Sequence, residues 1–423
     1  MKTTFILTIV ALGTSASIAL AQNPDHGGQP QSPPRHEAGG PGKYTIAQAT
    51  SDRAQLNTIA FDGLAFLTGD FCCDTFLPPG KVSDFFGFQN MRDVDGAAMG
   101  HNTDFLTRIA DNTLNILNDQ QKAELIALGR AQAPQIRELA LKRFPLIRAF
   151  CRNLSGNLPA GSAGLNRDAV MKYTAGNFEL SGQLAFERAA VYGKIIQALT
   201  PDQKAAFAKL KFGDSRTWPD LPEVFDKRTV PHDVHVAMMT YASEFFSWYA
   251  GSVESDTYFC PEGHGTYFGS FYMKDAPAVH QKNYSISTAL TGDSGEAFLA
   301  ALNPTQREQI SGLIELQRQD LQNIVSTRRA VATELRKFET GDSADREKVL
   351  ALCRHYGELD GELSYCYATH FAEVNKTLTG DQRAELKKLR GIEGFTAKSP
   401  FVYADPVESP EIENTDFLFV PGT

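Results

Sequence analysis

A five-residue pattern that starts helices occurs four times in this chain. Each copy has Leu, then Thr or Asn, then two variable positions and then Gln. The copies are Leu117-Asn118-Asp119-Gln120-Gln121, Leu199-Thr200-Pro201-Asp202-Gln203, Leu302-Asn303-Pro304-Thr305-Gln306 and Leu378-Thr379-Gly380-Asp381-Gln382. In such a capping box the Thr or Asn side chain accepts a hydrogen bond from the Gln backbone N–H. The Gln side chain in turn accepts a hydrogen bond from the backbone N–H of the Thr or Asn. Each copy therefore predicts the start of a helix.

The spacing of the four boxes indicates a tandem duplication. The length of chain from the first box to the third is nearly the same as that from the second to the fourth. Residues 179–186, before the second box, resemble residues 358–365, before the fourth. An aromatic stretch with glycine at residues 85–93 likewise resembles residues 267–275. Because these registers agree over long distances, we expect two repeats of one structural unit.

The stretches between the boxes have the pattern of amphipathic helices. In residues 306–337 the apolar side chains fall mostly at helical spacing, and charged side chains fill the other face. Strand signals are few, and long helices with short breaks favour antiparallel neighbours in a bundle. The sequence therefore predicts an all-α fold of two tandem pseudo-symmetric repeats, with aromatic and Gly-containing loops and an extended C-terminal tail.

The order of segments along the chain predicts export. Residues 1–21 have a basic start, an apolar core and small residues before a cleavage point, which is typical of a signal peptide. Polar residues and glycine interrupt this apolar run too early for a membrane span, so we expect no transmembrane segment in the mature chain. Residues 22–44 are predicted to be a flexible Pro/Gly-rich leader, 45–230 the first helical repeat with a connector, 231–391 the second repeat and 392–423 an acidic extended tail. The expected location is periplasmic or secreted.

The charge of the chain argues against two classes of partner. The formal net charge is −9 at pH 7. A nucleic-acid partner requires a basic footprint, and binding to anionic lipid by bulk charge requires one as well. The sequence also lacks G-x-S-x-G, H-E-x-x-H and P-loop motifs in a fitting context, so no catalytic residue is predicted.

Six cysteines are candidates for disulfides in an exported protein. They are Cys72, Cys73, Cys151, Cys260, Cys353 and Cys366. An even number in an oxidising compartment favours pairing, and six cysteines allow 15 connectivities. The adjacent Cys72 and Cys73 cannot readily pair with each other, so each would need a distant partner.

One helix start carries candidate metal ligands. His232, His235 and Met239 share one face of a predicted helix. Imidazole and thioether ligands suit copper or haem iron. One helix supplies only part of a coordination shell, and the alternative is an ordinary helix start with a partly buried Met. No cofactor is predicted on this ground.

The four boxes, on long amphipathic helices behind a signal peptide, resemble the LTxxQ-motif family of Spy/CpxP-type periplasmic proteins. The resemblance covers the boxes and their flanking helices, roughly half the chain. It implies an all-helical fold, a homodimer in many members, and the activity of an ATP-independent chaperone or envelope-stress protein. This chain departs from the family in its length, its four boxes instead of two, its cysteines and its acidic charge.

The leading hypothesis is a non-enzymatic protein that binds apolar segments of an unfolded or envelope protein partner. Six aromatic side chains of the two loops are the predicted contact points: Phe85, Phe86, Phe88, Tyr267, Phe268 and Phe271. The alternative for these residues is that they close the ends of the bundle. Two other functions remain open, namely a metal- or haem-binding protein for envelope metal handling or electron transfer, and a structural component of the envelope or extracellular space.

Overall fold

The prediction of an all-α bundle is confirmed by the computed structural model of the chain. The structure describes residues 50–68, 104–211, 217–222, 224–253, 296–390, 401–402, 405–406, 408, 410–412 and 414–422. Helices dominate this part of the chain, and two-residue strands β1 (Phe401–Val402) and β2 (Asp405–Pro406) pair antiparallel in the tail. Among the described helices, none has the length and apolar character needed to cross a membrane.

The two halves contain corresponding helices. In the first half these are α4 (Asp104–Ile116), α5 (Asp119–Leu141), α6 (Phe144–Ser155), α7 (Arg167–Gln197) and α8 (Pro201–Phe207). In the second half they are α13 (Glu296–Ala301), α14 (Pro304–Leu335), α15 (Lys337–Thr340), α16 (Arg346–Thr377) and α17 (Gly380–Arg390). The halves are preceded by α2 (Asp52–Thr68) and α9 (His232–Ala250), and short 3₁₀ turns η3 (Lys227–Thr229) and η5 (Asp416–Leu418) complete the described elements.

Each of the four boxes begins a helix at the expected residue. Helices α5, α8, α14 and α17 start directly after Asn118, Thr200, Asn303 and Thr379. Both reciprocal bonds are present in every box; in the third, Gln306 N donates to Asn303 Oδ1 at 2.9 Å and Asn303 N donates to Gln306 Oε1 at 2.8 Å. The leucine before each cap is buried in the core. The motif therefore joins a helix start to a core contact.

The boxes also bind one another in pairs. Gln203 Nε2 donates to Gln121 Oε1 at 2.7 Å and to the carbonyl of Ile116 at 2.9 Å. In the second half, Gln382 Nε2 donates to Gln306 Oε1 at 2.8 Å and to the carbonyl of Ala301 at 2.9 Å. Each capping glutamine thus links its own helix start to the other box of the same half, which fixes the two ends of that half together.

Helices α7 and α16 form the centre of the bundle and run antiparallel. Gly182 on α7 lies so close to α16 that a Cβ would come within 2.7 Å of Cys353 Sγ. Gly361, the counterpart of Gly182 in the second repeat, meets α7 in the same way, with a Cβ reaching 2.8 Å from Met171 Cα. These contacts are related by a pseudo-two-fold axis, because Cys353 is in turn the counterpart of Thr174, the other neighbour of Gly361.

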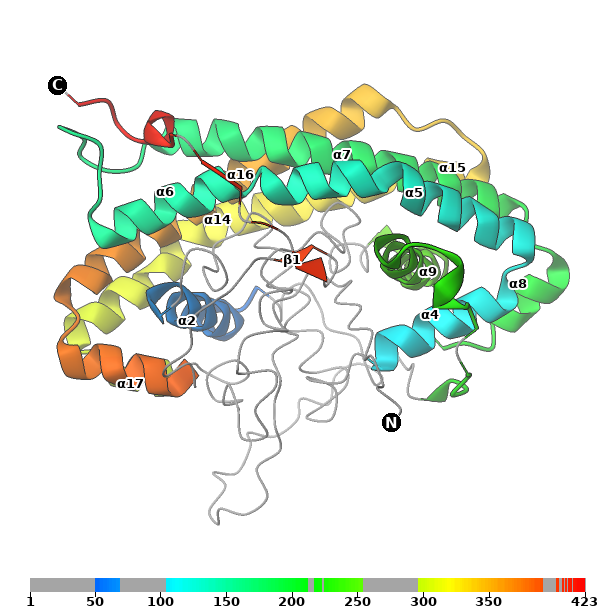
Figure 1. Cartoon of the computed structure of the whole chain (residues 1–423), viewed down its shortest axis with the longest axis horizontal. Coiled ribbons are helices and arrows are strands. Elements are labelled where there is room, and N and C mark those ends of the chain that lie inside the picture. Colours follow the sequence, from blue (N-terminus) through cyan, green and yellow to red (C-terminus); the bar gives the residue numbers. More distant parts are fainter. Residues whose placement is uncertain are drawn as a thin grey trace, which may run out of the picture.

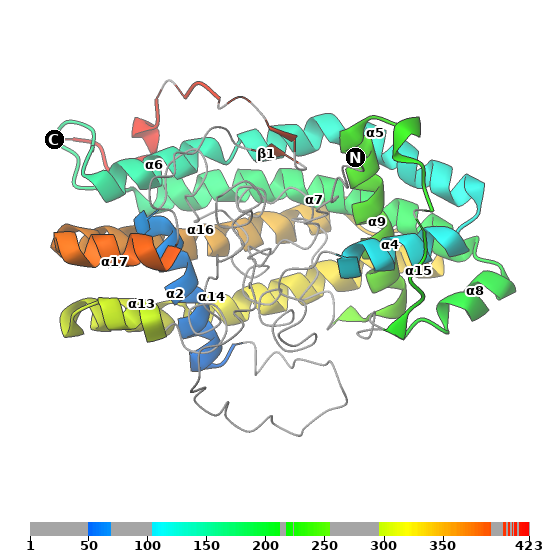
Figure 2. The same ribbon diagram turned by 60° about the horizontal axis from the view of Figure 1, so that its bottom comes forward.

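The two halves exchange their first helices. Helix α2 precedes the first half in sequence but packs on α13, α14 and α17 of the second, whereas α9 precedes the second half and packs on α4 and α5 of the first. Figures 1 and 2 show these two groups at opposite ends of the long central helices. Two hydrophobic cores result, which we name the α2 core and the α9 core after the exchanged helices. Each core therefore contains helices from both halves of the sequence.

Candidate functional site

The two halves differ where α5 ends and α6 begins. When the halves are aligned by their capping boxes, α14 (Pro304–Leu335), which is continuous, corresponds to α5 and most of α6. In the first half this stretch is interrupted at Lys142 and Arg143. Pro145 stands at the start of α6 and supplies the cause, because proline lacks a backbone N–H and its ring clashes with the carbonyl four residues earlier. The break therefore distinguishes the first repeat from the second.

Side chains of α7 bind the backbone that the break exposes. Tyr173 Oη donates to the carbonyl of Lys142 at 2.9 Å, and Asn177 Nδ2 donates to the same carbonyl at 3.4 Å. The Tyr173 side chain is half-buried, and this burial raises its pKa to about 12. The phenol therefore remains a hydrogen-bond donor at neutral pH, and the break is held in one geometry.

An open groove of about 770 Å³ lies at this break. One wall comes from the exposed face of α5 and the start of α6, where Pro134, Arg137, Glu138, Leu141 and Pro145 follow at helical spacing. Tyr173 of α7 borders the same space together with Lys142. The proline rings, the leucine and the phenol make this wall largely apolar.

The C-terminal tail forms the other wall of the groove. Pro410, Glu411, Ile412 and Asn414 line it. Directly after these residues the tail is fixed to α6, because Arg152 Nη1 donates to Thr415 Oγ1 at 2.8 Å and to Asp416 Oδ1 at 2.7 Å.

Backbone and apolar contacts anchor the rest of the tail. Asn166 N donates to the carbonyl of Leu418 at 2.8 Å, and Val420 N donates to the carbonyl of Gly164 at 2.9 Å. The side chains of Leu418 and Phe419 are buried in the α2 core, and the Arg152 guanidinium lies 4.9 Å from the centre of the Phe419 ring. The second wall therefore has a firm attachment next to the groove.

The rim of the groove carries charges of both signs. Lys142 Nζ pairs with Glu138 Oε1 at 2.7 Å. Arg137 and Glu411 are exposed, and neither has a hydrogen bond or ion pair to any residue in the described part of the chain. A largely apolar helix wall with free charges at the rim is suited to a ligand that is itself part apolar and part charged.

Two prolines in the sequence are the signal that could have indicated this groove. Pro134 and Pro145 stand about three helical turns apart, so they share a face with Leu141 between them. Two prolines on one face of a helical pattern mark a kink or break. The six aromatic residues predicted as contact points, Phe85, Phe86, Phe88, Tyr267, Phe268 and Phe271, lie outside the described residues.

The three candidate metal ligands do not share one environment. His232 is exposed at the start of α9, whereas His235 and Met239 are each 2% exposed. The His235 ring stacks on Phe225 with centroids 5.9 Å apart and an interplanar angle of 19°. Among the described residues, no three His, Cys, Asp or Glu side chains come together as ligands for a metal. The described part of the chain therefore supplies no carboxylate, thiolate or imidazole set to complete a shell.

Three of the six cysteines lie in the described helices. Cys353 is buried between α7 and α16, and Cys151 and Cys366 are half-buried; no disulfide joins these three to one another. Burial and the neighbouring carboxylates Glu362 and Asp320 raise the pKa of Cys366 to about 12. Cys72, Cys73 and Cys260 lie outside the described residues, so the disulfide pattern stays a prediction.

A cluster of polar side chains lies inside the α9 core. Arg188 of α7 donates to Gln132 Oε1 at 3.0 Å, and Tyr241 Oη donates to the same oxygen at 2.9 Å. Glu244 accepts from Tyr192 Oη at 2.8 Å and pairs with Arg188 at 3.4 Å. All five side chains are buried, so the cluster braces α5, α7 and α9 from within.

Comparison of the chain with protein-family models, with curated proteins and with solved structures found no match. The proposed function therefore depends on the groove itself.

Proposed function

We propose that this chain is an exported, non-enzymatic binding protein that holds apolar segments of unfolded or envelope proteins in the groove between α5, α6, α7 and the tail. It would act without ATP, in the manner of the Spy/CpxP-type chaperones that its capping boxes resemble. The observation that supports the proposal is the groove, which has a largely apolar helix wall and free charges at its rim.

The size and openness of the groove suit this role. Its volume of about 770 Å³ falls in the range of ligand-binding pockets, roughly 300–1,000 Å³. Because it is open to solvent, it can take part of a long chain without enclosing it. The rings of Pro134 and Pro145 lose little conformational freedom on contact, which lowers the entropic cost of binding. A contact of this size gives weak affinity and rapid release, as a holdase needs.

A matched pair of substitutions tests the proposal. Leu141 is half-buried in the groove, whereas Leu316 is 52% exposed on α14, outside it. We expect the wild-type protein to suppress the aggregation of reduced insulin B chain at a near-stoichiometric ratio. Leu141→Lys should raise the concentration needed for half-suppression about fivefold, since the lost apolar contact contributes ~1 kcal/mol. Leu316→Lys should leave this concentration unchanged.

Light scattering at 360 nm measures the effect, and circular dichroism shows that both variants keep their helices. A wild-type protein that fails to suppress aggregation even in large molar excess would contradict the proposed function. Equal loss of activity in Leu141→Lys and Leu316→Lys would remove the groove from the mechanism.

A further inference from the structure

We infer that the partner segment binds as an extended strand, pairing its backbone with tail residues 410–412 along the groove. This inference rests on the proposed function and names its partner as an extended peptide segment in which apolar side chains alternate with polar or acidic ones.

The backbone of tail residues 410–412 has no hydrogen-bond partner in the described part of the chain. The N–H groups of Glu411 and Ile412, and the carbonyls of residues 410–412, make no hydrogen bond within the described part of the chain. Residues Pro410, Glu411 and Ile412 all line the groove. A row of unpaired backbone donors and acceptors beside an open space is a template for the addition of a strand.

The tail is also prepared to act as an edge. The ring of Pro410 fixes the φ angle of that residue. The tail therefore has less backbone conformational entropy to lose when a strand pairs with it. At the other end the bonds of Arg152 to Thr415 and Asp416 hold the chain against α6. An anchored segment loses less entropy on pairing than a free one, which favours binding here.

The opposite wall decides which side chains fit. Every second side chain of a strand points to the same face, so a strand beside the tail would place alternate residues against Pro134, Leu141 and Tyr173. Arg137 stands at the rim without an ion pair to a described residue and is available to a carboxylate of the partner. An alternating apolar and polar segment with an acidic residue therefore fits both walls.

Proline scanning with side-chain controls tests the strand pairing in the full-length protein. Proline removes one N–H, whereas alanine removes the side chain and keeps the N–H. The N–H groups of successive residues face opposite edges of a strand, so one of Glu411 and Ile412 faces the groove. The probe is a fluorescein-labelled dodecapeptide that alternates valine with serine and carries two glutamates, and binding is followed by fluorescence anisotropy.

We expect one of Glu411→Pro and Ile412→Pro to weaken binding of the dodecapeptide at least tenfold relative to its own alanine variant. Glu408→Pro, at an exposed tail position that does not line the groove, should bind as the wild type does. A dodecapeptide with N-methyl groups on alternate residues of one edge should lose binding as well, because it cannot pair on that edge.

Three results would overturn the inference. If both proline variants bind like their alanine counterparts, or if the wild type suppresses aggregation but does not bind the dodecapeptide, strand pairing is wrong and the proposed function stands. If the wild type neither binds the dodecapeptide nor suppresses aggregation, the proposed function fails together with the inference.

Discussion

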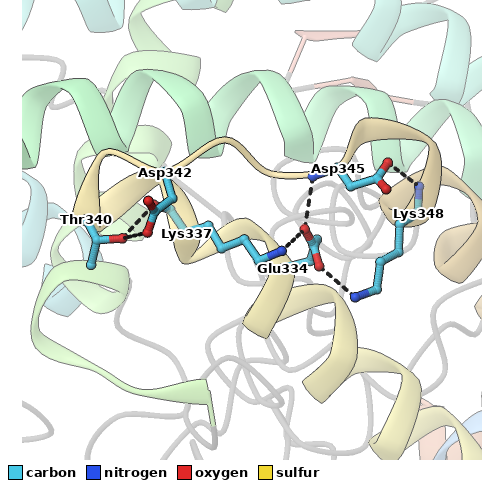
Figure 3. A network of polar contacts seen from close by, with 6 residues as sticks. All are labelled: Glu334, Lys337, Thr340, Asp342, Asp345 and Lys348. Carbon is cyan, nitrogen blue, oxygen red and sulfur yellow. Dashed lines mark hydrogen bonds and ion pairs between the residues drawn. The ribbon is translucent and has the colours of Figure 1, made fainter.

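At the scale of single residues, Glu334 shows how one buried carboxylate can organise a helix turn. Its side chain, 1% exposed, accepts from Lys337 Nζ at 2.5 Å, from the Asp345 backbone N–H at 2.9 Å and from Lys348 Nζ at 2.8 Å. Figure 3 shows these bonds, with Asp345 in turn capping α16 through the Lys348 N–H. The carboxylate thus joins the end of α14 to α15 and to the start of α16.

The same bonds make Glu334 sensitive to acid. The Asp345 N–H, followed by Lys337 and Lys348, lowers the pKa of Glu334 from its ordinary 4.5 to about 2. The pKa is lower in the folded state, so this stabilisation is complete above pH 4.5 and is lost as the pH falls toward 2. We expect Glu334→Gln to cost about 1–2 kcal/mol at pH 7 and to flatten the fall in stability between pH 4.5 and 2.

Urea unfolding at a series of pH values measures both effects. Glu347→Gln is the matched control on the neighbouring helix, because Glu347 is 78% exposed and pairs only at 3.4 Å with Arg346. An unchanged slope in Glu334→Gln between pH 4.5 and 2 would show that Glu334 is not the group responsible.

At the scale of helices, the close crossing of α7 and α16 depends on glycine. A Cβ at Gly182 or Gly361 would lie within 3 Å of the other helix, so the helices would have to separate. We expect Gly182→Ala and Gly361→Ala each to destabilise the protein by about 1–3 kcal/mol, the usual cost of overpacking. At the exposed Gly176 on α7 an added Cβ would meet nothing within 4 Å, and Gly176→Ala should stabilise by about 0.5–1 kcal/mol through helix propensity.

Chemical denaturation gives the three free energies of unfolding under identical conditions. Gly176→Ala carries the same substitution on the same helix as Gly182→Ala. The difference between the two variants therefore separates steric crowding against α16 from the gain in helix propensity. Stabilisation in all three variants would mean that α7 and α16 tolerate a wider separation than the structure shows.

At the scale of the whole molecule, the exchange of α2 and α9 makes the halves interdependent. The α9 side chains Met238, Tyr241 and Phe245 are completely buried among first-half helices. Each large apolar side chain buried in this way contributes roughly 1.5–3 kcal/mol. A boundary drawn between the repeats, after residue 230, therefore separates the first half from a helix that completes its core.

Two fragments that differ by α9 test this dependence. We expect residues 45–230 to show little helical signal and no cooperative thermal transition by circular dichroism, because the α9 core is open. Residues 45–253 retain α9 and should show more helix and a cooperative transition. Both fragments lack α14 and α16 and carry α2 without its partners, so α9 is the difference between them. A fragment 45–230 as stable as 45–253 would contradict the role assigned to the exchange.

The sequence alone determined the local features of this protein. The capping bonds of Asn118, Thr200, Asn303 and Thr379 depend on residues three positions apart, and apolar spacing defines a helix face without reference to the rest of the fold. The duplication was likewise detectable from the order of residues alone, because matching segments recur at nearly constant spacing. The helices, their starts and the duplication could therefore be predicted from the sequence.

The tertiary structure decided everything that joins distant segments. The pairing of Gln121 with Gln203, the exchange of α2 and α9, and the docking of the tail beside Pro145 each bring together residues that lie far apart in the sequence. Because the two repeats are pseudo-symmetric, α2 and α9 could each pack in an equivalent position in either half. The spacing of apolar residues in one helix therefore does not determine which half it packs against. The groove arises from such a meeting of distant segments, because the break between α5 and α6 supplies one wall and the tail supplies the other.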